Sequence, residues 1–344
     1  MGHKKIRVVV VDDAEFMRKE LTRILESDQD IEVAGYGKTG QEGIEAIKTL
    51  KPDVVTLDID MPEMDGITAL KHIMIECPTP VVVVSALTHQ GDVTFESLRL
   101  GVVDFLPKPS GSVSRDIESQ KEELIHRIKI ASTVDVEKIR RVRIREISGR
   151  PKMDYAPWMK KRIVSIGTSL GGPNHIIRLV HHLPRDFETP IIISQDISPM
   201  ILTSFVEKFN TVSPISVVVA SDKMILRRST VYVNSLSNDI GVHEDIFEDA
   251  FYLKLQPSDG KPIDAMMISV AEIFESGTIG ILLAGVNQDG VRGIEEIYKK
   301  GGTTLIQNYE THFLPDSNRD VLEQGLITQV IDDFHDIPVL KNDL

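Results

Sequence analysis

The chain has 344 residues, of which 41% are hydrophobic, with a mean hydropathy of −0.06 and a formal net charge of −13. This composition indicates a globular protein long enough for two domains, and the negative charge argues against a general nucleic-acid partner, which would require a basic face. No apolar run is long enough to span a bilayer, the amino terminus lacks a signal-peptide pattern, and the single cysteine excludes an internal disulfide framework. We therefore expect a cytoplasmic protein without membrane insertion.

Residues 6–130 alternate strand-like and helix-like segments. The strand-like segments are IRVVVV, IEVAGY, VVTLD, VVVVSA and DFLPK, and helical patterns such as FMRKELTRILE and GIEAIKTL lie between them. Strands that alternate with helices predict βαβ units and a parallel sheet. Residues 118–131 have the pattern of a last helix in this half of the chain.

Residues 131–161 are charged and contain two prolines, so we interpret them as an interdomain linker. Their basic run 138–152, KIRRVRIREISGRPK, is either a solvated surface or a segment that binds an acidic partner surface. A second alternating series follows, with the strand-like segments IVSIG, IIISQ, ISVVVA, TIGILLAG and TTLIQ and with helices expected between them. The sequence therefore predicts an α/β protein with domains at residues 1–130 and 162–344, each a mainly parallel, doubly wound sheet.

Five polar side chains follow the predicted strands of the first domain: Asp12, Asp13, Asp58, Ser85 and Lys108. In a doubly wound sheet these strand ends meet at one edge, so the side chains are expected to converge. Three carboxylates at one place require a cation, and oxygen ligands of this kind suit Mg²⁺. An aspartate beside Mg²⁺, a lysine and a hydroxyl forms a site for phosphoryl transfer to a carboxylate.

The joint pattern DD…LDIDMPEMDG…SA…KP resembles the receiver domain of response regulators over roughly residues 4–128. The resemblance implies that Asp12 and Asp13 form the acidic pocket, that Asp58 accepts the phosphoryl group and that a histidine kinase is the phosphodonor. It also implies that the backbone carbonyl of Asp60 coordinates the metal. Ser85, Lys108 and Phe105 match the switch hydroxyl, the lysine and the aromatic switch position.

In the second domain, IVSIGTSLGGPNHIIRLV predicts a strand, a glycine-rich turn and a helix, with Ser169 on the turn. Two interpretations compete. In one, the turn binds a phosphate at the amino terminus of the helix. In the other, it carries a nucleophilic serine, and its backbone N–H groups hold an oxyanion. A later strand ends in a loop that carries Asp289, which is a candidate second member of a catalytic triad.

The stretch IIISQDISPM, residues 191–200, places Asp196 at the end of another strand. From its position alone, Asp196 is a solvated loop residue, a helix cap or a catalytic group. A metal held by Asp196 and Asp289 is a further hypothesis, but it rests on only two ligands.

Together with the receiver-like half, these segments resemble the chemotaxis receptor methylesterase (CheB) family over nearly the whole chain. That family hydrolyses glutamyl methyl esters on chemoreceptors, and some members deamidate glutamines. The resemblance implies that phosphorylation controls the second domain and that chemoreceptor cytoplasmic domains are its partners. Ser169 matches the nucleophile and Asp289 the aspartate that orients the base.

Four changes separate this sequence from the family pattern. Asp196 stands where the family has the catalytic histidine, Val286 and Asn287 replace a methionine between glycines, the segment 233–239 has neither glycine nor histidine, and KPID at 261–264 is all that remains of Arg-Pro-Ser-Val-Asp. These departures surround one presumed pocket.

An ordinary carboxylate, with a pKa of about 3.9, is a poor proton acceptor near neutral pH, whereas histidine suits the task. Three other histidines are candidate replacements: His175 on the helix after Ser169, and His243 and His312 in expected loops. None matches a family position, so we expect weak or absent esterase activity. Two functions stay open: a phosphorylation-gated methylesterase with altered chemistry, and a phosphorylation-gated binding or scaffold protein.

Overall fold

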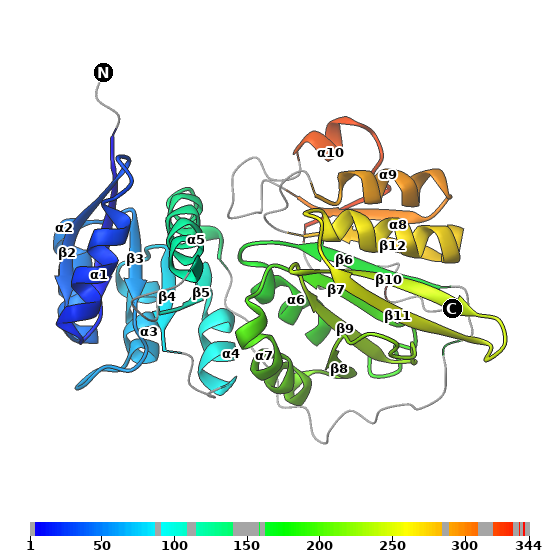
Figure 1. Cartoon of the computed structure of the whole chain (residues 1–344), viewed down its shortest axis with the longest axis horizontal. Helices are drawn as coiled ribbons and strands as arrows, with labels where there is room; N and C mark the ends of the chain where they lie inside the picture. Colours follow the sequence, from blue (N-terminus) through cyan, green and yellow to red (C-terminus); the bar gives the residue numbers. More distant parts are fainter. Residues whose placement is uncertain are drawn as a thin grey trace. The chain divides into compact units, whose positions relative to one another are not determined.

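The structure is a computed structural model that describes residues 4–86, 91–108, 115–139, 158, 162–283, 289–308, 319–332, 337 and 340. The chain divides into two compact units, Met1–Arg141 and Val142–Leu344 (Figure 1). Two α/β domains are thus confirmed, and the boundaries of the linker at 131–161 stay a prediction because most of that segment lies outside the described residues.

The first unit is a five-stranded parallel sheet with the strand order β2-β1-β3-β4-β5. Its valine-rich central strands are buried because helices cover both faces of a parallel sheet. Helix α1 packs beside α5, and α3 packs against α2 and α4. The strands are β1 (Ile6–Val11), β2 (Ile31–Gly37), β3 (Val54–Leu57), β4 (Val81–Ser85) and β5 (Asp104–Pro107). The helices are α1 (Glu15–Leu25), α2 (Gly40–Leu50), α3 (Gly66–Glu76), α4 (Gly91–Leu100), α5 (Arg115–Ala131) and the short η1 (Val136–Lys138).

Local sequence fixes where two of these helices begin. The Thr39 hydroxyl accepts a hydrogen bond from the N–H of Glu42 at the start of α2, and the Asp65 carboxylate accepts one from the N–H of Thr68 at the start of α3. Such side-chain caps satisfy N–H groups that have no partner within the helix. The Asp65 cap also ends the loop that follows β3, and that loop carries Asp58.

The second unit is built on a seven-stranded sheet with the order β14-β13-β12-β6-β7-β9-β8, in which all paired strands are parallel. The strands are β6 (Ile163–Thr168), β7 (Ile191–Gln195), β8 (Ser216–Val219), β9 (Thr230–Ser235), β12 (Thr278–Leu282), β13 (Thr303–Gln307) and β14 (Gln329–Ile331). The helices are α6 (Gly172–His181), α7 (Pro199–Val212), α8 (Pro262–Phe274), α9 (Val291–Lys299), α10 (Arg319–Glu323) and the short η2 (Glu275–Gly277). In Figure 1, α6 and α7 cover one face of this sheet, and α8 and α9 cover the other.

A two-stranded antiparallel hairpin, β10 (Asn238–Asp245) and β11 (Ala250–Pro257), stands apart from the large sheet. It packs on α8, where the Ser269 hydroxyl accepts a hydrogen bond of 2.9 Å from the N–H of Val242. The helix expected between β8 and β12 is present as α8, but the three strands β9, β10 and β11 that precede it are not among the predicted strand segments. His243 was expected in a loop, but it lies on β10 with its side chain exposed.

The core of the second unit includes Trp158, the only tryptophan in the chain, at 1% exposure. Its backbone N–H donates to the carbonyl of Leu226 at 2.8 Å, and its indole N–H donates to the carbonyl of Arg162 at 2.7 Å. Burial of so large a side chain fastens the carboxyl-terminal end of the predicted linker to this unit. No helix in the described part of the chain is long and apolar enough to cross a membrane.

Candidate functional sites

The first site lies at the carboxyl edge of the receiver-like sheet, where the neighbouring strands β1, β3, β4 and β5 end. The Asp58 side chain is 2% exposed. Its Oδ1 accepts hydrogen bonds from the Ser85 hydroxyl at 2.9 Å and from the N–H of Ile59 at 2.7 Å, and its Oδ2 accepts one from Lys108 Nζ at 2.6 Å. The structure therefore brings Asp58, Ser85 and Lys108 together, as the sequence predicts.

Asp12 and Asp13 complete the acidic cluster. One carboxylate oxygen of each lies within 4.8 Å of the others and of one from Asp58, and Lys108 Nζ lies 2.8 Å from Asp12 Oδ2. Three carboxylates against one ammonium leave two net negative charges in a largely buried site. This donor set fits a divalent cation with oxygen ligands, and Mg²⁺ is the ion that such carboxylates bind beside a phosphate.

Burial and pairing shift the charges in this cluster in a consistent way. Burial raises the pKa of the Asp12 carboxyl, and the contact with Lys108 offsets only part of that rise. For Lys108, burial lowers the pKa, but the hydrogen bonds to Asp12 and Asp58 outweigh burial and hold it above its usual value. Lys108 therefore stays protonated as the counter-charge of the site.

Two further predicted residues lie nearby without a contact that assigns their roles. Phe105 is on β5 at 4% exposure, and the side chain of Asp60 is exposed on the loop after β3. Arg18 was missed by sequence reasoning: its guanidinium donates to the backbone carbonyls of Asp12 and Asp13 at 2.7 and 2.8 Å. It fastens the acidic turn to α1, and no pattern in the sequence points to that contact.

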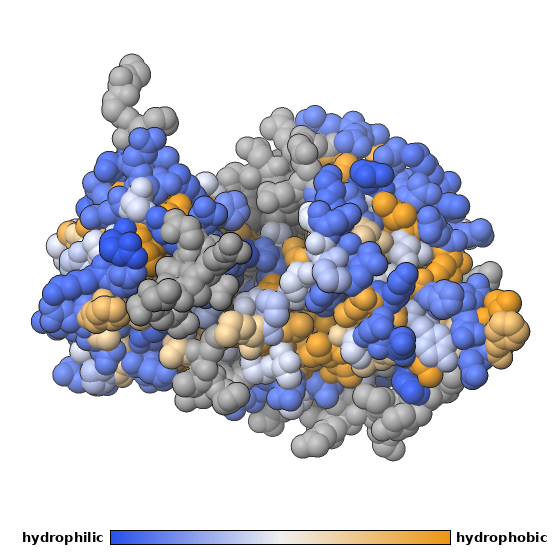
Figure 2. Space-filling model, viewed as in Figure 1, coloured by the Kyte–Doolittle hydropathy of each residue, from blue (hydrophilic) through white to orange (hydrophobic). Residues whose placement is uncertain are grey.

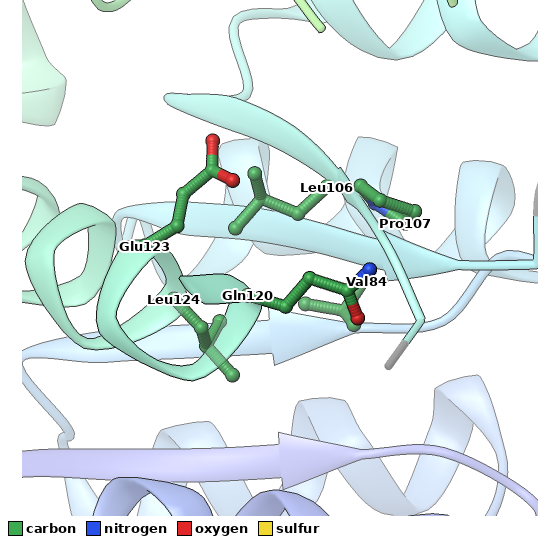
Figure 3. A pocket seen from close by; sticks show the side chains of 6 residues that line it. All are labelled: Val84, Leu106, Pro107, Gln120, Glu123 and Leu124. Atoms are coloured by element: carbon green, nitrogen blue, oxygen red, sulfur yellow. The ribbon is translucent and has the colours of Figure 1, made fainter. Parts of the chain in front are cut away.

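A small pocket on the same unit lies between α5 and the ends of β4 and β5 (Figure 3). It contains none of the side chains of the acidic cluster, so it is separate from the candidate phosphorylation site. Its lining is mainly apolar and consists of Val84, Leu106, Pro107, Gln120, Glu123 and Leu124.

The second site is the turn between β6 and α6 that carries Ser169, which is half-buried. Gly171 caps α6 with a φ of 71°, a left-handed conformation that favours glycine. A Cβ at Gly172 would lie 2.2 Å from the Thr168 hydroxyl and 2.7 Å from Gln195 Oε1, so the close approach of β6, β7 and α6 needs glycine there. The glycine-rich motif thus serves the tight turn that sequence reasoning expected.

Gln195, the last residue of β7, joins the two halves of this site. Its Nε2 donates to the backbone carbonyl of Ser169 at 3.2 Å and to that of Asp196 at 2.9 Å. The N–H of Asp196 in turn donates to the carbonyl of Thr168 at 3.1 Å. Ser169 and Asp196 therefore sit on backbone segments that one buried amide holds together, a role for Gln195 that the sequence alone did not assign.

Asp196 is not the cap of the helix that follows it. Ser198 is the N-cap of α7, and its hydroxyl accepts a hydrogen bond from the N–H of Met200. The Asp196 side chain is half-buried at the carboxyl end of β7. Of the three possibilities drawn from its position, the helix cap is thus wrong.

Asp289 lies before α9, and the structure ties its carboxylate to another helix. Oδ2 accepts from the N–H of Ile263 at 3.0 Å and Oδ1 from the N–H of Asp264 at 2.8 Å, both in the first turn of α8. Asp264 Oδ1 in return accepts from the N–H groups of Gly290 and Gly293 at 3.0 and 2.8 Å. Burial raises the pKa of the Asp289 carboxyl, although these backbone donors lower it.

The candidate replacement histidines lie in different surroundings. His175 is on α6 at 5% exposure, and its Nδ1 lies 3.2 Å from the carbonyl of Gly171. His312, Val286 and Asn287 lie outside the described residues. The segment 233–239, which has neither glycine nor histidine, comprises the end of β9, a short turn and the start of β10.

Comparison with known proteins places both units in families. The receiver domain of response regulators matches residues 8–115, and the family described as CheB methylesterase matches residues 164–338. A protein-glutamate methylesterase/protein-glutamine glutaminase of Pyrococcus horikoshii is 36% identical over 95% of this chain and 90% of its own length. One from Thermotoga maritima is 34% identical over 96% of each chain. The crystal structure of the Thermotoga maritima CheB methylesterase catalytic domain is 27% identical, covers 52% of this chain and 95% of its own, and has a TM-score of 0.48.

A receiver joined to a methylesterase-type domain defines the class of chemotaxis response regulators to which this architecture belongs. The chain belongs to the protein-glutamate methylesterase/protein-glutamine glutaminase family.

Proposed function

We propose that this chain is a cytoplasmic two-component response regulator of a chemotaxis-type pathway, in which phosphorylation of Asp58 controls the methylesterase-type second domain. The observation that carries this proposal is the set of contacts at Asp58, whose two oxygens meet Ser85, Lys108 and the N–H of Ile59. A histidine kinase is the phosphodonor, and chemoreceptor cytoplasmic domains are the expected partners of the second domain.

Transfer to Asp58 forms one bond and breaks one. A carboxylate oxygen of Asp58 attacks the phosphorus of the donor's phosphohistidine, a P–O bond forms, and the P–N bond breaks to release the imidazole, which takes up a proton. Lys108 neutralises charge on the phosphoryl oxygens, and the Ser85 hydroxyl, 2.9 Å from Asp58 Oδ1, is placed to donate to the acyl phosphate.

Asp12, Asp13 and Asp58 are the side chains proposed to hold Mg²⁺, with the backbone carbonyl of Asp60 as a further ligand. The ion supplies neutralisation of the transferring group when bound. Burial of Asp12 and the excess of carboxylates over Lys108 support this assignment, because such charge requires a cation.

The esterase chemistry of the second domain is proposed to be weak or absent. The base must take a proton from Ser169 near neutral pH and return it to the leaving alcohol, and the position of that base holds Asp196. Both carboxylate oxygens of Asp289 accept backbone hydrogen bonds from the first turn of α8, which holds this side chain against that helix. Loss of the histidine in serine proteases lowers the rate by roughly 10⁶-fold.

A second candidate function is therefore a phosphorylation-gated binding protein without catalysis. The specific observation in its favour is that the Gln195 amide holds the Ser169 turn against the backbone of Asp196, so the turn is ordered while the position of the base holds an aspartate. Such a site would bind a glutamyl side chain without hydrolysing its ester.

Phosphotransfer is tested by labelling the full chain with acetyl phosphate and Mg²⁺. Asp58→Asn should abolish the label. Asp60→Asn is the matched control, because the proposed contact of Asp60 is through its backbone, and it should label normally. A labelled Asp58→Asn protein would overturn the phosphoacceptor assignment, and a silent Asp60→Asn protein would overturn the backbone role of Asp60.

Esterase activity is tested by methanol release from methylated chemoreceptor, with the phosphorylated full chain and its Ser169→Ala and Asp196→His variants. We expect little release from the unchanged chain and a gain with Asp196→His. Clear turnover by the unchanged chain that Ser169→Ala removes would eliminate the binding-protein candidate. Binding of the methylated receptor without turnover would support it.

A further inference from the structure

The tip of the β10–β11 hairpin exposes an unusual pair of apolar side chains. Ile246 is 77% exposed and Phe247 is 94% exposed, the largest exposure among the large hydrophobic residues of the described chain. The hairpin extends to the edge of the second unit in Figure 1, and orange apolar atoms lie at the corresponding edge in Figure 2. A pair of this kind on a protruding element marks a binding surface more often than an isolated exposed residue does.

The turn that carries the pair is built from specific contacts. Asp245 Oδ1 accepts hydrogen bonds from the N–H groups of Phe247 at 2.9 Å and Glu248 at 3.2 Å. Asp249 closes the turn with a φ of 49°, which aspartate tolerates better than most residues. The apolar pair is therefore presented in a defined geometry.

Carboxylates surround the pair. Glu244, Asp245, Glu248 and Asp249 flank it, and the segment 244–249 contains no basic residue. Among the residues that the structure describes, none forms an ion pair with these four. An apolar tip flanked in sequence by four carboxylates calls for an occupant that combines apolar and basic side chains. It disfavours anionic membranes, nucleic acids and a second copy of a chain whose net charge is −13.

The chain itself contains such a segment. Residues 140–147, RRVRIREI, alternate arginines with valine and isoleucine, and the basic run 138–152 has Glu146 as its only acidic residue. Only Lys138 and Ile139 of this run are among the described residues, so the run is characterised by its sequence.

Trp158, which follows the basic run in the sequence, lies close to the hairpin. Trp158 donates to the carbonyl of Leu226 at 2.8 Å, and the N–H of Leu226 donates to the carbonyl of Phe251 on β11 at 2.8 Å. Two such hydrogen-bonded steps of about 4.8 Å place Trp158 about 10 Å from β11. Phe251 is close to the turn in sequence, and residues 148–157, at up to about 3.5 Å each, can span the remaining distance.

We propose that the basic linker segment 140–147 docks on the acidic, apolar tip formed by residues 244–249 of the same chain. The arginines pair with the tip carboxylates, and the alternating valine and isoleucines cover Ile246 and Phe247. Docking fastens the linker to the second unit. The inference does not depend on the proposed function, because neither phosphorylation nor esterase chemistry enters it.

Trypsin cleavage of the linker in the full chain tests the docking. The tip variant Glu248→Gln/Asp249→Asn keeps the turn, because Asn also tolerates the left-handed φ at 249, and the control variant Glu207→Gln/Glu272→Gln removes the same charge from exposed positions elsewhere on the unit. Cleavage follows the population of the open segment, so the tip variant and Phe247→Ser should each be cut about tenfold faster and the control at the original rate. Equal rates in all proteins, or an equal rise in the control, would overturn the proposal.

Cross-linking identifies the occupant. In a Cys77→Ser background, the pair Arg145→Cys/Phe247→Cys should form a disulfide within one chain, whereas Arg145→Cys/Glu272→Cys should not. A disulfide between two chains would assign the tip to a second copy and overturn the intrachain proposal. No disulfide in the tip pair would overturn it as well.

Discussion

Asp264 and Asp289 exchange helix caps. The Asp289 side chain caps α8, which contains Asp264, and the Asp264 side chain caps α9, which follows Asp289. The Asp289 carboxylate accepts hydrogen bonds from N–H groups in the first turn of α8. The Asp264 carboxylate, on α8, accepts hydrogen bonds from the N–H groups of Gly290 and Gly293 at the start of α9. Each carboxylate faces the positive end of a helix dipole, which stabilises negative charge. The two helices are thus locked together at their amino termini.

The Asp264 cap should be needed for stability. Because one oxygen, Oδ1, accepts both hydrogen bonds, Asp264→Ala should lower the free energy of unfolding of the second unit by about 2–3 kcal/mol. Asp264→Asn retains that oxygen and should cost about 1 kcal/mol or less. Urea unfolding followed by circular dichroism measures both. Equal losses for Ala and Asn would show that charge, and not the acceptor oxygen, is what matters.

The stability of the second unit should depend on pH through Asp289. Burial raises the pKa of this carboxyl in the folded chain, above the value of about 3.9 that an unfolded aspartate has. The folded state therefore gains stability from Asp289 below pH of about 4 and loses it as the pH rises through the folded pKa. Asp289→Asn does not titrate. The difference in unfolding free energy, unchanged chain minus variant, should decrease from pH 3.5 upward, and a difference that increases would contradict this sign.

Magnesium binding should become tighter when Lys108 is removed. Lys108 occupies the cluster as its counter-charge, and two unit charges 4 Å apart interact by about 4 kcal/mol near a protein surface. If about a third of this repulsion energy opposes Mg²⁺ binding, Lys108→Ala should raise the Mg²⁺ affinity about tenfold. Calorimetric titration compares it with Lys129→Ala, whose ammonium contacts Asp28 and Asp30 away from the cluster. Weaker binding in Lys108→Ala would mean that the lysine organises the carboxylates for the metal.

Tyr232 should couple stability to alkaline pH. Its hydroxyl donates to the carbonyl of Ile225 at 2.9 Å and accepts from the N–H of Arg227 at 2.8 Å, and burial raises its pKa from 10.0 to about 12. The neutral phenol therefore stabilises the fold below pH 10, and this is lost between pH 10 and about 12. A shift of two units corresponds to roughly 2–3 kcal/mol. The stability difference between the unchanged chain and Tyr232→Phe should shrink over that range, and a constant difference would refute the assignment.

Much of the receiver site followed from the sequence because its residues directly follow buried strands. Strand ends of a parallel sheet meet at one edge, so Asp12, Asp58, Ser85 and Lys108 could be brought together without knowing any tertiary contact. The contact of Arg18 could not be foreseen, since it depends on how α1 is oriented against the acidic turn.

The second unit was harder to predict for two physical reasons. The β10–β11 turn has none of the Asn-Gly or Asp-Gly pairs that announce a hairpin, because it relies on the Asp245 side chain and a left-handed Asp249. The caps exchanged by Asp264 and Asp289 depend on which helix ends are neighbours in space, and that is a property of the assembled fold.

The burial of Trp158 gives the protein an optical label of its own. The chain has one tryptophan, and its indole lies at 1% exposure within the core of the second unit. Tryptophan emission from the full chain therefore reports the state of that unit alone, while the far-ultraviolet signal sums both. The unfolding of the two domains can be separated in a single sample without cutting the linker or introducing a dye.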